Sequence, residues 1–225
     1  DSGWPSLAGG LSNNIRSGVQ YSNAFGFSNQ VRGGSSHNTL GESNIIKAGR
    51  ANTSAGYNNN IENGNFISVL GTANNVLAGS SHIAGGENNT IKNGNANILF
   101  GQTNTAEGSY LGAIGKDNSV YYQSAVALGQ ANKDSGWATI AGGLSNTVNA
   151  GVQYSALFGT TNRIGGGTAH MLMGESNLVS AGRANTVAGY ANNVITGNFI
   201  SAFGTSNDIL AGNSHIAGGE NNTIK

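Results

Sequence analysis

The chain has 225 residues, ten basic and ten acidic side chains, and no cysteine. Its zero net charge and the absence of a basic run exclude a nucleic-acid partner held by phosphate contacts. The lack of cysteine excludes disulfides, thiolate zinc sites and cysteine catalysis. No apolar stretch approaches the roughly 18 residues of a membrane span. Because the chain lacks an initial Met and ends within a repeat at Lys225, it is expected to be a fragment of a longer protein.

A Gly–x–x–Asn unit recurs along the whole chain. Consecutive units are 14 to 16 residues apart. We number positions from the first glycine of each unit, the turn glycine, as position 0. The turn glycines are Gly10, Gly26, Gly41, Gly56, Gly71, Gly86, Gly101, Gly115, Gly129, Gly143, Gly159, Gly174, Gly189, Gly204 and Gly219.

This period predicts a parallel β-solenoid, or β-roll, of about fifteen coils. It is too short for helix-pair repeats and lacks the leucine pattern of leucine-rich repeats. Each coil is expected to contain a strand over positions −5 to −1, such as 96–100 or 124–128, then a turn and a second strand near +5. Position +5 is Ile or Val in thirteen units and is expected to fill the interior; the exceptions are Ala106 and Asp134.

Both faces of the first strand are apolar or small. Position −1 is bulky or Gly in most units, and position −2 is mostly Ala. Since alternate residues of a strand face opposite sides, one face is expected to line the interior and the other to face outward. A solvated face is normally polar. A small, Ala-rich outer face would therefore indicate close packing against another chain.

The asparagine at +3 is present in every unit and predicts a structural ladder of stacked amides. Fifteen separate ligand sites are the alternative reading. The ladder residues are Asn13, Asn29, Asn44, Asn59, Asn74, Asn89, Asn104, Asn118, Asn132, Asn146, Asn162, Asn177, Asn192, Asn207 and Asn222.

A longer repeat lies over the short one. Residues 1–92 match 134–225 without a gap, and SHIAGGENNTIK occurs in both copies, at 81–92 and 214–225. The chain is therefore interpreted as a single repetitive region, residues 1–225, made of a 133-residue block (1–133) and a truncated second block (134–225).

The candidate chemistry is weak. All four histidines occupy position −4, but His37 and His82 are three coils apart, about 14 Å by strand spacing, which is too far for one metal ion. A metal site could form only where three chains meet on an axis; a packed or hydrogen-bonded interface histidine is the favoured reading. No catalytic triad, carboxylate pair or phosphate loop is present, so we expect no enzyme, cofactor or metal.

The best ligand-binding candidates lie where the repeat is irregular. The coils from Gly101 to Gly143 shorten to 14 residues. Exposed aromatic residues there could anchor a ligand, or could instead cover a change in coil path. The candidates are Trp4, Tyr121, Tyr122, Trp137, Ser124 and Val126.

Three segments carry a resemblance to a known family. SAVALGQAN (124–132), YLGAIGKDN (110–118) and WATIAGGLSN (137–146) resemble the Ser-x-Ala-Ile-Gly coil of the YadA-like head of trimeric autotransporter adhesins. The +3 asparagine is nearer to the family's GGxxN variants. The resemblance implies a left-handed roll packed as a homotrimer and displayed outside a Gram-negative outer membrane.

The function expected from this resemblance is attachment to host matrix, host cells or other bacteria through multivalent contacts. The partner would be a matrix or cell-surface protein or another bacterial cell, with no nucleic acid. Membrane attachment is expected only through a C-terminal anchor outside this sequence. Alternatives are a purely structural trimeric shaft, filament or phage-fibre element, and an ice-binding solenoid.

Overall fold

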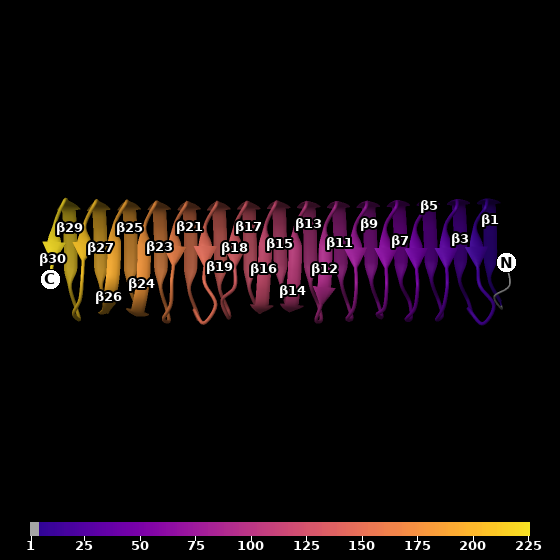
Figure 1. Cartoon of the computed structure of the whole chain (residues 1–225), viewed down its shortest axis with the longest axis horizontal. Helices are drawn as coiled ribbons and strands as arrows, with labels where there is room; N and C mark the ends of the chain where they lie inside the picture. Colours follow the sequence, from indigo (N-terminus) through magenta and orange to yellow (C-terminus); the bar gives the residue numbers. More distant parts are fainter. Residues whose placement is uncertain (1–4) are drawn as a thin grey trace. The chain divides into compact units, whose positions relative to one another are not determined.

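The computed structural model describes residues 5–225 and is built of β-strands stacked in coils (Figure 1). The strands form two parallel fifteen-stranded sheets, so the predicted β-solenoid of about fifteen turns is confirmed. Trp4, one of the predicted ligand residues, lies outside the described residues. Within residues 5–225, no helix has the length and apolar character needed to cross a membrane.

Sheet I contains the odd-numbered strands and runs over positions −3 to +1 of each coil. Each strand pairs in register with the next, turn glycine opposite turn glycine, as in Gly10 opposite Gly26. The strands are β1 (Leu7–Leu11), β3 (Asn23–Phe27), β5 (Asn38–Glu42), β7 (Thr53–Tyr57), β9 (Ser68–Thr72), β11 (Ile83–Glu87), β13 (Ile98–Gln102), β15 (Gly112–Lys116), β17 (Val126–Gln130), β19 (Ile140–Leu144), β21 (Ala156–Thr160), β23 (Met171–Glu175), β25 (Thr186–Tyr190), β27 (Ser201–Thr205) and β29 (Ile216–Glu220).

Sheet II contains the even-numbered strands, which begin at position +4. Its strands are β2 (Asn14–Ile15), β4 (Gln30–Val31), β6 (Ile45–Ile46), β8 (Asn60–Ile61), β10 (Asn75–Val76), β12 (Thr90–Asn93), β14 (Thr105–Ser109), β16 (Ser119–Gln123), β18 (Lys133–Asp134), β20 (Thr147–Val148), β22 (Arg163–Ile164), β24 (Leu178–Arg183), β26 (Asn193–Asn198), β28 (Asp208–Ile209) and β30 (Thr223–Ile224).

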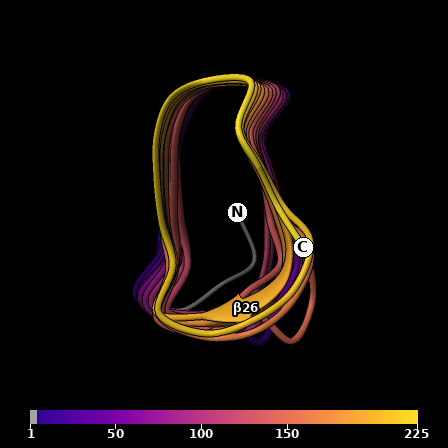
Figure 2. The same ribbon diagram turned by 90° about the vertical axis from the view of Figure 1, so that its left-hand side faces the viewer.

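The chain forms two compact units, residues 1–114 and 115–225, each a stack of coils. Within a unit, successive coils superpose as one flattened loop when viewed along the stack (Figure 2). The units divide after residue 114, whereas the repeated sequence block ends at residue 133. The block therefore describes repetition of the sequence and not a structural unit.

The sheet I strand begins two residues later than predicted. Position −5 adopts a left-handed backbone conformation, as at Ser81 with φ 59° and Ala96 with φ 53°, and cannot continue a strand. The turn glycine is also left-handed, with φ 104° at Gly86. A Cβ on Gly86 would lie 2.1 Å from the carbonyl oxygen of Gly101, so close stacking of the turns requires glycine in each coil.

The interior is filled by positions −4, −2, +3 and +5. The predicted +5 core is present, since residues such as Ile15, Ile91 and Ile164 are fully buried. Position −2 also faces inward, as at Ala84 and Leu157. The expectation of an Ala-rich outer face was therefore wrong. The small residues at −2 line the interior, because the +3 asparagines and the +5 side chains already occupy much of it. The bulky residues at −1 lie outside.

The +3 asparagines form the ladder within each unit. The Oδ1 of Asn74 accepts hydrogen bonds from both the Nδ2 and the backbone N–H of Asn89, each at 3.0 Å. The Nδ2 of Asn89 also lies 2.8 Å from the carbonyl oxygens of Gly85 and Gly101, so one amide ties together three coils. In the second unit the Nδ2 of Asn146 bonds to Asn132 in the same way, at 3.1 Å.

Position −4 carries a second polar ladder of mixed composition. The backbone N–H of Asn52 donates to Nδ1 of His37 at 3.3 Å, and the N–H of Ile67 donates to Oδ1 of Asn52 at 3.1 Å. His37 Nε2 lies 3.1 Å from the Gly33 carbonyl oxygen and therefore carries the proton. His82 and His170 repeat this arrangement. His37, His82 and His170 are therefore packed and hydrogen-bonded, as expected, but they lie inside the coil and not at an interface.

Candidate interaction surfaces

The structure does not bring all the predicted ligand residues together: two line a hollow, two lie at sheet I, and Tyr121 belongs to neither place. Tyr122 in β16 and Trp137, between β18 and β19, line one hollow. Tyr121 is half-buried beside Tyr122 and is not among its lining residues. Ser124 is exposed at the left-handed turn before β17, with φ 55°, and Val126 is half-buried at the start of β17. The last two belong to the edge and outer face of sheet I.

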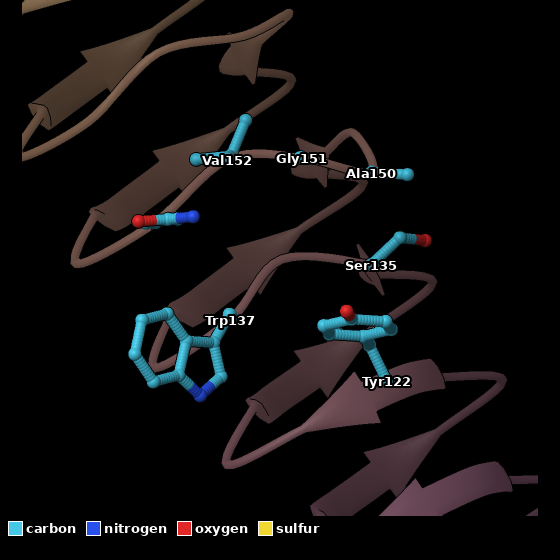
Figure 3. Close-up of a pocket in the computed structure, with 7 residues that line it drawn as sticks. Tyr122, Ser135, Trp137, Ala150, Gly151 and Val152 are labelled. Carbon is cyan, nitrogen blue, oxygen red and sulfur yellow. The ribbon is translucent and has the colours of Figure 1, made fainter.

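The hollow has a volume of about 180 Å³ and lies within the second unit. Its lining residues are Tyr122, Ser135, Trp137, Ala150, Gly151, Val152 and Gln153. Figure 3 shows Tyr122 and Trp137 projecting from neighbouring coils, with Ala150 and Gly151 on a turn of the next coil. A coil of 16 residues (Gly143 to Gly159) here follows one of 14 (Gly129 to Gly143), so the longer loop overhangs a shorter one.

Tyr122 occupies a position that is glycine in most other coils. It lies seven residues before its turn glycine, where the equivalent Gly34 and Gly79 have φ of 89° and 115°. A Cβ on Gly34 would lie 2.0 Å from the carbonyl oxygen of Gly49 in the next coil. Tyr122 has φ 84° and is 68% exposed, so the strain of about 1–3 kcal/mol is not offset by burial.

Asp134 lies in the interior of the neighbouring coil, the one that carries Trp137. It replaces the +5 Ile or Val and is fully buried. Its Oδ1 accepts the backbone N–H of Gly136 at 3.1 Å and the hydroxyl of Thr139 at 2.5 Å, which fixes a tight path over 134–139. Its Oδ2 is buried and has no hydrogen-bond partner in the described residues. Burial raises the pKa of Asp134 to about 6, although the bonds from Thr139 and Gly136 oppose the shift.

Tyr154 is a further aromatic residue that sequence reasoning missed. Its ring centroid lies 5.0 Å from that of Trp137, with the planes tilted by 56°. The sequence did contain a pattern that could have identified Tyr154. Position −5 is aromatic in every third coil and is Ser or Ala in the coils between. The aromatic residues at −5 are Tyr21, Phe66, Tyr110, Tyr154 and Phe199, which are 56–61% exposed.

The outer face of sheet I is the largest apolar feature of each unit. Positions −3, −1 and +1 point outward, and in many coils they carry large apolar side chains that are more than one-third exposed; position +1 also carries exposed charged residues such as Glu42 and Glu175. The large apolar residues are Leu7, Leu11, Phe25, Phe27, Leu40, Tyr57, Leu70, Ile83, Ile98, Phe100 and Ile114 in the first unit, and Leu128, Ile140, Leu144, Phe158, Met171, Met173, Tyr190, Phe203 and Ile216 in the second.

Glycines at −1 flatten this face. The ring of Phe100 lies over Gly85 of the preceding coil, where a Cβ would meet the ring at 2.6 Å; Phe158 covers Gly142 in the same way, at 2.9 Å. A large ring in one coil thus fills the space left by glycine in the coil before it. Beside β19 and β23, a shallow hollow of about 460 Å³ is lined in part by Ile140, Tyr154 and Met171.

The outer face of sheet II is polar by contrast. Lys47 pairs with Glu62, and Nζ of Lys92 lies 3.0 Å from Oε2 of Glu107. The side-chain amides of Asn60 and Asn75 bond at 2.8 Å. These partly exposed pairs contribute little to stability, but they give sheet II an ordinary solvated surface. The two sheets therefore differ in the bulky apolar side chains on the outer face of sheet I.

The histidines and carboxylates do not converge on an ion. Among residues 5–225, no group of three or more His, Asp or Glu side chains is placed to hold a metal. His37, His82 and His170 are buried in the coil interior, and burial lowers the pKa of each below its usual value. Their geometry is that of a structural hydrogen-bond ladder.

Comparison of the chain with protein-family models and with curated proteins gave no match. The fold and the surfaces described above therefore carry the functional argument.

Proposed function

We propose that the chain is the head of a trimeric autotransporter adhesin, in which three copies pack through the outer faces of sheet I. The observation that supports this most strongly is the asymmetry between the two sheets. Sheet I exposes bulky apolar side chains in coil after coil, whereas sheet II exposes polar and paired charged ones. Contiguous exposed apolar surface of this kind is rare on soluble monomers and marks an interface.

A second copy of the same chain is the natural occupant of this face. Both surfaces then repeat at the same strand spacing, about 4.8 Å, so each coil meets equivalent side chains along the stack. The flat Phe–Gly packing, as at Phe100 over Gly85, lets such surfaces approach closely. The number three and the left-handed roll come from the resemblance of residues 110–118, 124–132 and 137–146 to YadA-like heads.

In this proposal the solvated faces present an extended, nearly neutral surface at the bacterial exterior. Contacts that repeat over coils and over three chains add to give avidity without a strong individual site. The partner would be a host matrix or cell-surface protein or another bacterial cell.

Light scattering on the purified chain tests the assembly. The parent protein is expected to be a stable trimer, and Leu128→Glu with Met173→Glu, which place charges on the sheet I face, should give monomers. Thr147→Glu on sheet II is the matched control and should leave the trimer intact. A parent protein that stays monomeric at high concentration would remove the proposal.

Solid-phase binding then separates an adhesin from a shaft. The trimer is expected to retain immobilised matrix proteins or whole bacteria, with binding lost on conversion to monomers. A stable trimer that binds none of these surfaces would identify a purely structural shaft instead.

A further inference from the structure

The hollow between Tyr122 and Trp137 is assembled from departures from the repeat. Tyr122 stands seven residues before its turn glycine, where most other coils have glycine. Trp137 stands at a position that is polar in neighbouring coils (Gln123 and Gln153), and Asp134 stands in the core. A repeat without these departures would lack both aromatic rings. Three departures in two adjoining coils, each unfavourable for a regular coil, converge on one surface feature.

The interior carboxylate acts as a positioning group for this hollow. Asp134 is fully buried and does not line the hollow, but it holds Gly136 and Thr139 on either side of Trp137. Its bonds set the short path of that loop, and the long loop at Ala150–Gly151 forms the opposite wall (Figure 3).

The lining combines aromatic surface with uncharged hydrogen-bonding groups. All seven lining residues are uncharged. The Tyr122 and Ser135 hydroxyls, the Trp137 indole N–H and the Gln153 amide have no side-chain hydrogen bond within residues 5–225. The faces of aromatic rings carry partial negative charge and attract the polarised C–H groups of a sugar ring, while the free polar groups match its hydroxyls.

We propose that this hollow binds a neutral pyranose ring, as part of a glycan. A volume of about 180 Å³ is small for a peptide segment but suits one sugar unit. Uncharged walls select against acidic sugars, whose carboxylate would lose water without gaining a cationic partner. The site lies at the end of β16 and in the loops that follow β18 and β20, apart from the outer face of sheet I.

The assignment names a ligand class for the adhesin proposed above and rests on that function for its biological role. Binding of one sugar ring is weak, so affinity would come from repetition in three chains. The DSGW motif at 1–4 duplicates 134–137, and a 16-residue coil follows both copies, so these sequence elements of the site occur twice in the chain.

Tryptophan fluorescence gives a direct test, because Trp4→Phe leaves Trp137 as the single tryptophan. The probes are the methyl glycosides of glucose, galactose and N-acetylglucosamine, with a sialic acid glycoside and choline as charged comparisons. At least one neutral glycoside is expected to shift the Trp137 emission saturably. Absence of a response to all three, or a response to choline alone, would overturn the proposal.

Two variants restore residue types found at the same positions elsewhere and so preserve the coil. Tyr122→Gly and Trp137→Gln should each weaken glycoside binding by at least about tenfold. Because Trp137→Gln removes the fluorophore, its binding is measured by ligand-observed NMR. Tyr190→Ala, an exposed aromatic on sheet I, is the control and should bind as the parent does. Unchanged binding in both site variants would place the ligand elsewhere.

The outcome is separable from that of the adhesin proposal. A trimer that adheres to matrix proteins but ignores glycosides would remove only the sugar site. A monomer whose Trp137 still reports glycoside binding would retain the site and remove the trimeric head.

Discussion

The Oδ1 of Asn74 accepts two hydrogen bonds from Asn89 at 3.0 Å, one from the side-chain amide and one from the backbone. Each ladder residue therefore satisfies backbone groups of its neighbours as well as its own amide. Asn104 continues the pattern, with its N–H 3.0 Å from Oδ1 of Asn89. Removal of one amide consequently affects three coils at once.

Asn89→Ala is expected to lower the free energy of unfolding by roughly 3 kcal/mol or more, because several buried partners lose their hydrogen bonds at about 1–3 kcal/mol each. Asn88→Ala is the matched control. Asn88 is exposed with φ 55°, and Ala73 and Ala131 occupy the same left-handed position, so its cost should stay below about 1 kcal/mol. Urea unfolding of the two variants measures this difference in the free energy of unfolding. Equal small losses of stability in both variants would contradict the ladder.

The histidine ladder predicts a loss of stability in mild acid. Burial lowers the pKa of His37, His82 and His170 below the usual 6.5. The unfolded chain then binds more protons than the folded chain, so the free energy of unfolding falls as pH drops below about 6.5. Above that pH the contribution of these histidines to stability is fully present.

His82→Asn tests this pH dependence without removing the acceptor, since Asn97 serves the same role one coil further along. The variant should unfold with a smaller pH slope between pH 7 and 5. His215, in the last coil, offers a comparison by the same substitution. A slope identical to that of the parent would show that His82 does not contribute.

Asp134 has the opposite pH dependence. Its pKa is raised from 3.8 to about 6, so the folded chain holds the proton more tightly than the unfolded chain. Its contribution to stability is present below about pH 4 and is lost as pH rises through 6. By linkage the ionised carboxylate costs about 3 kcal/mol at neutral pH.

Asp134→Asn is therefore expected to raise the free energy of unfolding at pH 8 by on the order of 1–3 kcal/mol, with little gain at pH 4. The asparagine oxygen can still accept the bonds from Gly136 and Thr139. Denaturant titrations at the two pH values supply the measurement. A stabilisation that is independent of pH would contradict the raised pKa.

The sequence predicted the coil period, the +5 core and the +3 asparagines, because each repeats at a fixed register. It did not predict which face of sheet I lies inside, because both faces are apolar. The space left in the interior decides that position −2, such as Ala84, points inward and position −1, such as Gly85, points outward. Two residues that line the hollow, Tyr122 and Trp137, were among the ligand candidates chosen from the sequence, but the hollow itself was not predicted. The role of Asp134 and the contact with Tyr154 depend on loop paths that differ from the repeat.

Two left-handed glycines, the turn glycine Gly86 and Gly18, allow steric crowding to be separated from backbone strain. Gly86 has φ 104°, and an added Cβ would lie 2.1 Å from the Gly101 carbonyl oxygen; Gly18 has φ 84°, and a Cβ there meets nothing within 4 Å. Gly18→Ala should cost only the left-handed penalty, about 1–2 kcal/mol. Gly86→Ala adds a clash between two backbones and should cost more than about 3 kcal/mol. Thermal unfolding of both variants provides the comparison, and equal costs would show that the coils can separate at the turn without penalty.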